Sequence, residues 1–187
     1  MQLNILLSNV ASFMKRRLIE LFGLILIALC FLFTFTLAFY SPENTTLIYK
    51  AEGAEAINIF YYYSNATADF FLQSFGLMSF VIGICILSWG INLIINKKIE
   101  NLLAKSFYLC LSLFFGCLFV YSSFNNSFWL IDNGNSGFVG ERSYSFFISF
   151  FPIIENEYFK IGFLILALAF FILSLSLIHI SEPTRPY

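Results

Sequence analysis

Few residues in this sequence have the types and spacing that catalysis or metal binding requires. The chain has four cysteines and one histidine among 187 residues. No Cys-x-x-Cys pair, the usual signature of a zinc or redox site, occurs, and all the cysteines fall inside apolar runs. We therefore expect the cysteines to be small packing residues in an apolar phase, and not metal ligands or disulfide partners. The four are Cys30, Cys85, Cys110 and Cys117.

A glycine-rich segment at residues 134–140 is the one stretch that could suggest phosphate binding. A P-loop needs the pattern GxxxxGK[ST] after a strand, and this segment has neither the lysine nor the hydroxyl residue behind it. We predict a flexible turn there. Paired carboxylates for acid–base catalysis are also missing from the sequence. The sequence thus predicts no catalytic residue, no bound cofactor and no metal site in this chain.

The composition places the chain in a membrane. Hydrophobic residues make up 59% of it, aromatic residues 20% and charged residues 11%, and the mean hydropathy is +0.83. A soluble core of this size could not bury 26 phenylalanines, whereas lipid can. The net charge of −1 only averages segments expected on opposite sides of a bilayer. We expect an all-α integral membrane protein, with the lipid bilayer as its main partner.

Four apolar runs have nearly spanning length. At 1.5 Å per residue, the run from Leu18 to Tyr40 covers about 35 Å, enough to cross a hydrocarbon core of ~30 Å. Pro42 should end this helix, and Asp69 is predicted to cap the start of the next span. The apolar run at residues 143–154 is too short to cross and predicts an interfacial or re-entrant helix. The predicted spans are residues 18–40, 70–95, 106–124 and 158–174.

Two outer loops are expected to carry interfacial features. The loop at residues 41–68 is acidic, with a weak helical patch at residues 51–56. Tyr61-Tyr62-Tyr63 and Trp129 are predicted at the depth of the headgroups, where an aromatic body is buried and its polar atom stays wet. Ligand stacking on the tyrosines is the alternative interpretation.

The distribution of basic residues predicts the orientation. Six basic residues lie before the first span or between the second and third spans. Up to residue 174, three others lie in the segments expected on the outer side: Lys50, Arg142 and Lys160. Because Lys and Arg are enriched in cytoplasmic loops, residues 1–14 are expected to be a cytoplasmic segment, either a short surface helix or without order. The six topology residues are Lys15, Arg16, Arg17, Lys97, Lys98 and Lys105.

Small residues in the second and third spans predict where helices approach one another. Three glycines recur at heptad spacing in the second span, and two small-xxx-small pairs accompany them. Such residues let helix backbones come close in lipid. The predicted packing residues are Gly76, Ser79, Gly83, Gly90, Ser112 and Gly116.

The last residues, 175–187, do not look like native protein. They match the translation of a transposase adapter used in preparing sequencing libraries, so we expect an artefactual tail. Native sequence would then stop near Ser174, inside the fourth span. The only histidine, His179, falls in this tail, which removes any acid, base or metal role for it.

With the elements placed, the layout resembles the amino-terminal four-helix membrane domain of the FtsK/SpoIIIE family of septal DNA translocases, over residues 15–174. The specificity of the resemblance lies in the order and spacing of short motifs. The chain departs from the family at Tyr61-Tyr62-Tyr63-Ser64-Asn65, where glycines usually precede the Ala-Asp pair. The motifs are Arg16-Arg17-Leu18-Ile19-Glu20, Tyr40-Ser41-Pro42-Glu43, Ala68-Asp69, Phe75-Gly76-Leu77, Trp89-Gly90 and Ser136-Gly137-Phe138-Val139-Gly140.

The resemblance implies a membrane anchor at the division septum, in the bacterial inner (plasma) membrane with the amino terminus in the cytoplasm. The anchor would serve a hexameric, ATP-driven DNA translocase in cell division and chromosome segregation. Homo-oligomerisation and division proteins as partners are implied as well. ATP and Mg²⁺ would bind only in a motor domain absent from this chain, and DNA would be contacted only through C-terminal domains. This fragment itself would then be no enzyme.

The alternative is a small polytopic membrane protein, a transporter or channel component unrelated to DNA. Such proteins usually place ionisable groups near the middle of the membrane. Here the polar candidates Glu20, Gln73 and Asn92 lie near the ends of the predicted spans. The sequence therefore favours the anchor.

Overall fold

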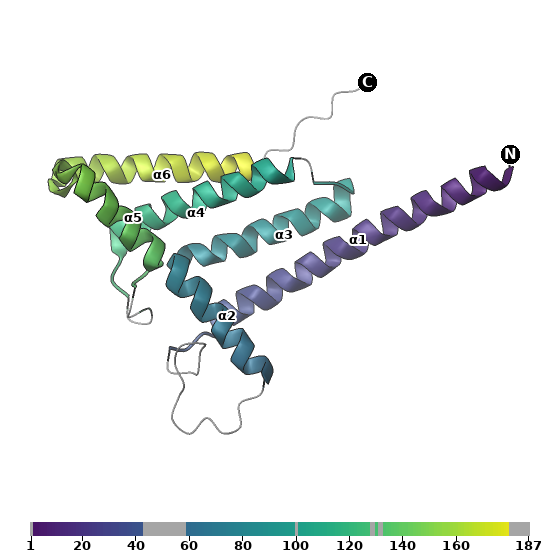
Figure 1. Cartoon of the computed structure of the whole chain (residues 1–187), viewed down its shortest axis with the longest axis horizontal. Helices are drawn as coiled ribbons and strands as arrows, with labels where there is room; N and C mark the ends of the chain where they lie inside the picture. The colour runs from purple at the N-terminus through teal and green to yellow at the C-terminus, as the bar shows by residue number, and fades with distance from the viewer. Residues whose placement is uncertain (1, 43–58, 100, 128–129, 131–132, 180–187) are drawn as a thin grey trace.

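The computed structural model in Figure 1 is mainly helical over the residues it describes, which are 2–42, 59–99, 101–127, 130 and 133–179. Three features predicted from the sequence lie outside these residues: the helical patch at 51–56, Trp129 and the tail from residue 180 onward. The α-helices are α1 (Gln2–Ala38), α2 (Ile59–Phe75), α3 (Ser79–Asn96), α4 (Leu102–Phe124), α5 (Gly137–Phe150) and α6 (Glu157–His179). The 3₁₀ turns are η1 (Gly76–Met78) and η2 (Pro152–Glu155).

Among the described residues, four stretches of helix are long and apolar enough to cross a membrane. The all-α membrane fold is therefore confirmed. In hydrocarbon every backbone N–H and C=O must find a partner within the protein, and a helix satisfies them within one segment. Large apolar side chains accordingly face outward, as with Phe31 at 65% exposure. The stretches are Val10–Ala38, Ile59–Asn96, Leu102–Phe124 and Glu157–Ile178.

The spanning helices form two antiparallel pairs (Figure 1). Helix α1 packs along α3, and α4 packs along α6, whereas α3 and α4 touch at few residues. The second pair is held by aromatic contacts, including the stacked rings of Phe115 and Phe170 at 4.9 Å between centroids. The short helix α5 closes the end of this pair, where Tyr144 lies against Tyr121 and Phe163.

The second span differs from the predicted one at residues 70–95. Its helical stretch begins at Ile59 and bends at η1, so that α2 leaves the bundle at an angle to α3 (Figure 1). Asp69 lies inside α2 and does not cap a helix, which corrects the prediction. Its Oδ1 accepts a hydrogen bond of 2.6 Å from the hydroxyl of Tyr40, just past the end of α1. This tertiary contact, together with the burial of Ala68 and Leu72 against Leu37, stabilises α2 on both sides of Asp69.

The remaining boundaries extend the predicted elements. Residues 2–14 continue α1 without interruption and are not a separate surface helix, since no helix-breaking residue separates them from the span. The fourth span begins at Glu157 and continues past Ser174 to His179. The predicted short outer helix is present as α5 followed by η2. It starts already at Gly137, so residues 137–140 are helical, contrary to the predicted flexible turn.

The bend between α2 and α3 depends on two glycines that face each other. Gly76 has φ +57° and Gly137 has φ +66°, a left-handed conformation that other residues adopt only with strain. A Cβ atom at Gly137 would lie 2.6 Å from the backbone nitrogen of Gly76, and one at Gly76 would overlap the carbonyl of Asn135. Next to this contact the N–H of Leu77 donates to the Asn135 carbonyl at 2.8 Å.

Two asparagines complete this junction: Asn135 donates to carbonyls at the end of α4, and Asn125 accepts from Ser136. The side-chain amide of Asn135 donates to the carbonyls of Phe124 and Asn126 at 3.0 and 2.9 Å. Asn125 Oδ1 accepts from both the backbone N–H and the hydroxyl of Ser136, at 3.0 and 2.7 Å. Helix ends carry unpaired backbone groups that are costly away from water, so these bonds stabilise the loop in one conformation.

We expect Gly76→Ala to destabilise the protein. The methyl group adds left-handed strain and a backbone overlap, together about 2 kcal/mol or more, or roughly 4–8 °C in Tm. The control is Gly162→Ala, because a Cβ atom there meets nothing within 4 Å. Thermal unfolding of the purified protein in detergent measures both variants, and equal Tm values for the two would contradict the role of the junction.

Candidate functional site

The functional candidates in the described part of the chain are surfaces and contacts between helices. Within the described part of the chain, His, Cys, Asp and Glu side chains form no group that could hold a metal ion. Cys30, Cys85 and Cys117 are buried free thiols, and Cys110 is exposed on α4. The candidates that remain are the basic residues at one end of the bundle, the close contacts between helices, and a polar group at the opposite end.

Glu20 connects the two basic clusters that the sequence predicts as topology signals. Its carboxylate lies 2.7 Å from Arg17 Nη1, within α1, and 2.5 Å from Lys97 Nζ, at the end of α3. Lys97 adopts a left-handed conformation with φ 56°, which ends α3, and its Nζ also donates to the Ile94 carbonyl. The two clusters, about 80 residues apart in sequence, therefore lie at the same end of the molecule.

The other basic residues of the two clusters differ in exposure. Lys15, Arg16 and Lys98 are exposed. The Arg17 guanidinium lies 5.1 Å from the centre of the Phe13 ring. Lys105, in the first turns of α4, is only 8% exposed. Exposed cations at the end of a helical bundle suit contact with anionic lipid headgroups, which attract juxtamembrane Lys and Arg.

Helices α1 and α3 approach each other closely. A Cβ atom at Gly90 would lie 3.0 Å from the Gly23 carbonyl and 2.8 Å from Ile27 Cγ1. Further along, the Cys30 thiol donates to the Gly83 carbonyl at 3.1 Å, and Thr34 Oγ1 lies 3.0 Å from a Cβ at Gly83. Gly83 and Gly90 therefore face α1, and their small size permits backbone contact there.

The other predicted packing residues lie at two separate places. Gly76 forms the junction with Gly137, and the buried Ser79 donates from its hydroxyl to the Phe71 carbonyl across the bend, at 2.7 Å. Gly116, on α4, lies between Met78 and Phe171 of α6. Ser112 is fully buried and donates to Leu109 of its own helix. Five of the six residues thus belong to three contacts and not to one continuous seam, whereas the hydrogen bond of Ser112 stays within α4.

Sequence reasoning missed several residues of these contacts. Gly23, the partner of Gly90, is a single glycine in α1 with no small residue four positions away, so no spacing signal marks it. The polar contacts at the end opposite the basic clusters, called the outer end below, were missed as well. There Asn133 donates to Gln73 Oε1 at 2.8 Å, and Tyr40 donates to Asp69. Each joins residues that are distant in sequence, and only the helix arrangement brings them together.

Comparison with known proteins adds a family match. A family described as the "4TM region of DNA translocase FtsK/SpoIIIE" matches residues 15–184. The match covers the first spanning stretch from residue 15 onward and the other three in full. It continues past Ser174, where native sequence is predicted to stop; the artefactual tail stays a prediction. No curated protein and no solved structure matches the chain.

The ion pair between Glu20 and Lys97 can be tested by charge exchange. Glu20→Lys places a third cation between Arg17 and Lys97, and we expect it to lower Tm in detergent. Adding Lys97→Glu should restore much of the loss, because opposite charges again face each other. The matched control adds Lys98→Glu, on the neighbouring exposed residue, and should restore less. Equal recovery by both double variants would show that net charge, and not this contact, matters.

Proposed function

Because the chain belongs to the family of 4TM regions of FtsK/SpoIIIE DNA translocases, we propose that it anchors such a translocase in the plasma membrane of a bacterium, at the division septum. The anchored protein would act in cell division and chromosome partition. The motor domain, with its ATP and Mg²⁺, and the contact with DNA belong to parts of the translocase outside this chain. The observation that carries the proposal is the family match over residues 15–184, combined with four helices able to span a membrane.

The proposed orientation places the amino terminus and the α3–α4 connection in the cytoplasm. Its support is the Glu20 ion-pair group, which holds both basic clusters at one end of the bundle. At the opposite end the described residues carry a more balanced set of charges, including Arg142 and Lys160 with Asp69, Glu141 and Glu157. Lys and Arg resist translocation across the membrane, so the end rich in them is expected inside.

The proposed partners are other copies of the chain and proteins of the division machinery. The outer end offers the surface for the latter. Helices α2 and α5 lie there across the ends of the spans, and their exposed aromatic side chains include Phe60, Tyr63 and Phe146. Aromatic residues are enriched both in protein interfaces and in the headgroup zone, which suits a contact made at the membrane surface.

Reporter fusions test the orientation. Alkaline phosphatase, which is active only outside the cytoplasm, should be active when fused at Asn44 and at Asn133 and inactive at Lys98. A fluorescent protein that folds only in the cytoplasm should show the reverse pattern. Fluorescence from the fusion at Asn44 would overturn the proposed orientation.

Septal placement is tested by imaging. A fluorescent protein on the amino terminus of the full chain should gather at the midcell of dividing bacteria. The control is an unrelated four-span membrane protein of similar length, which should label the cell outline evenly. An even outline for both proteins would contradict septal anchoring, while membrane insertion itself would still be seen.

A further inference from the structure

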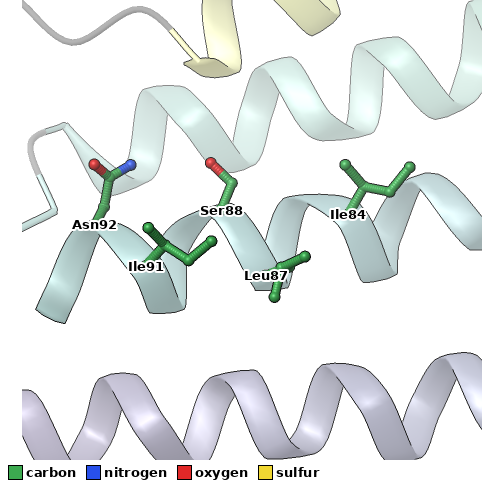
Figure 2. A pocket seen from close by; sticks show the side chains of 5 residues that line it. All are labelled: Ile84, Leu87, Ser88, Ile91 and Asn92. Carbon is green, nitrogen blue, oxygen red and sulfur yellow. The ribbon is translucent and has the colours of Figure 1, made fainter. Parts of the chain in front are cut away.

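A shallow hollow lies on α3, with α4 on one side and α1 on the other (Figure 2). Its volume is about 280 Å³, and it opens to the surroundings of the bundle. In Figure 2, Ile84, Ser88 and Asn92 point toward α4, with Leu87 and Ile91 beside them. All five side chains that line it belong to α3, which touches α4 at few residues.

The polarity of the hollow changes along its length. Ile84 and Leu87 lie at one end, and Asn92 lies at the other, where its Oδ1 accepts a hydrogen bond of 3.0 Å from Asn96. From Ile84 to Asn92 the helix rises about 12 Å, and from Asn92 to Lys97 about 8 Å more. A single leaflet contributes about 15 Å of hydrocarbon, so the hollow and the basic residues beyond it lie within one leaflet and its headgroup zone.

The polar end leads to an excess of positive charge. The helices beside the hollow, α3 and α4, are joined by the connection that carries Lys97 and Lys98, and Lys105 follows in the first turns of α4. Lys15, Arg16 and Arg17 lie at the same end, on α1. Among the described residues of this end, Glu20 is the acid that faces them, and it is engaged by Arg17 and Lys97.

We infer that this hollow binds an anionic phospholipid, with an acyl chain along Ile84, Leu87 and Ile91 and the phosphate near the exposed Lys98. Both halves of the ligand are matched. The apolar part fills space that water cannot occupy favourably, and the charged part meets cations that each contribute attraction to an anionic headgroup. A bound lipid would link the two helix pairs where the protein itself provides few contacts. The inference needs no assumption about the septum or about a motor domain.

Spin-labelled lipids test the site in the full chain reconstituted into phosphatidylcholine vesicles. A nitroxide on the acyl chain of phosphatidylglycerol should show a larger immobilised fraction than the same label on phosphatidylcholine. Lys98→Gln should weaken the preference for phosphatidylglycerol by about fivefold, from an attraction of about 1 kcal/mol per cation. Equal immobilised fractions for the two lipids would overturn the inference.

Variants that fill the hollow test whether the lipid preference comes from this site or from general contact with lipid. Ser88→Phe should remove the preference, whereas Ile172→Phe, on the lipid-exposed side of α6, should leave it unchanged. If Ser88→Phe does not fold, Ile91→Trp places the same bulk from an exposed position. If instead a second copy covers the hollow, these variants will lower the mass of the oligomer in light scattering and leave the lipid preference unaltered, which would also overturn the inference.

Discussion

The contact between Gly76 and Gly137 is the constraint on which the outer end of the molecule depends. Two left-handed residues from distant parts of the chain meet backbone to backbone, with no room for a side chain between them. At Gly76 the right-handed helix cannot continue, so α2 turns away from α3; at Gly137 the chain enters α5. The same contact therefore sets the start of the α3 span and the position of the short helix that closes the α4–α6 pair.

Much of the fold could be predicted because the thickness of the bilayer fixes the length of a span. Apolar runs of about 20 residues mark such helices directly in the sequence. The bend in the second span could not be predicted, since a glycine that permits close helix packing and a glycine with positive φ look alike in sequence. The heptad spacing puts Gly76 in the first class, and the glycine-rich stretch at 134–140 predicts a flexible turn at its partner Gly137. The prediction for Asp69 was wrong for a similar reason. A carboxylate before an apolar run is a typical helix cap, whereas here the Asp69 carboxylate lies within a helix and accepts a hydrogen bond from the Tyr40 hydroxyl.

At the candidate site the residue types were predictable and their contacts were not. Runs of Lys and Arg identify a topology signal without a structure. The bridge from Glu20 to Lys97 depends on the register between α1 and α3, which is set by the contact of Gly23 with Gly90. A single glycine in an apolar run carries no information about that register. The ion-pair group therefore cannot be predicted from the sequence and is seen only in the folded structure.

The uneven packing of the four spans follows from the physics of helices in lipid. Lipid chains are as apolar as the side chains they contact, so helices associate where small residues, hydrogen bonds or complementary shapes favour it. The α1–α3 pair has glycines and the Cys30 thiol at its contact, and the α4–α6 pair has Gly116 beside Phe171. The face of α3 toward α4 offers Ile84 and Ser88 but, along the hollow, no glycine. The two pairs consequently touch little there, and that face is open to a molecule supplied by the membrane.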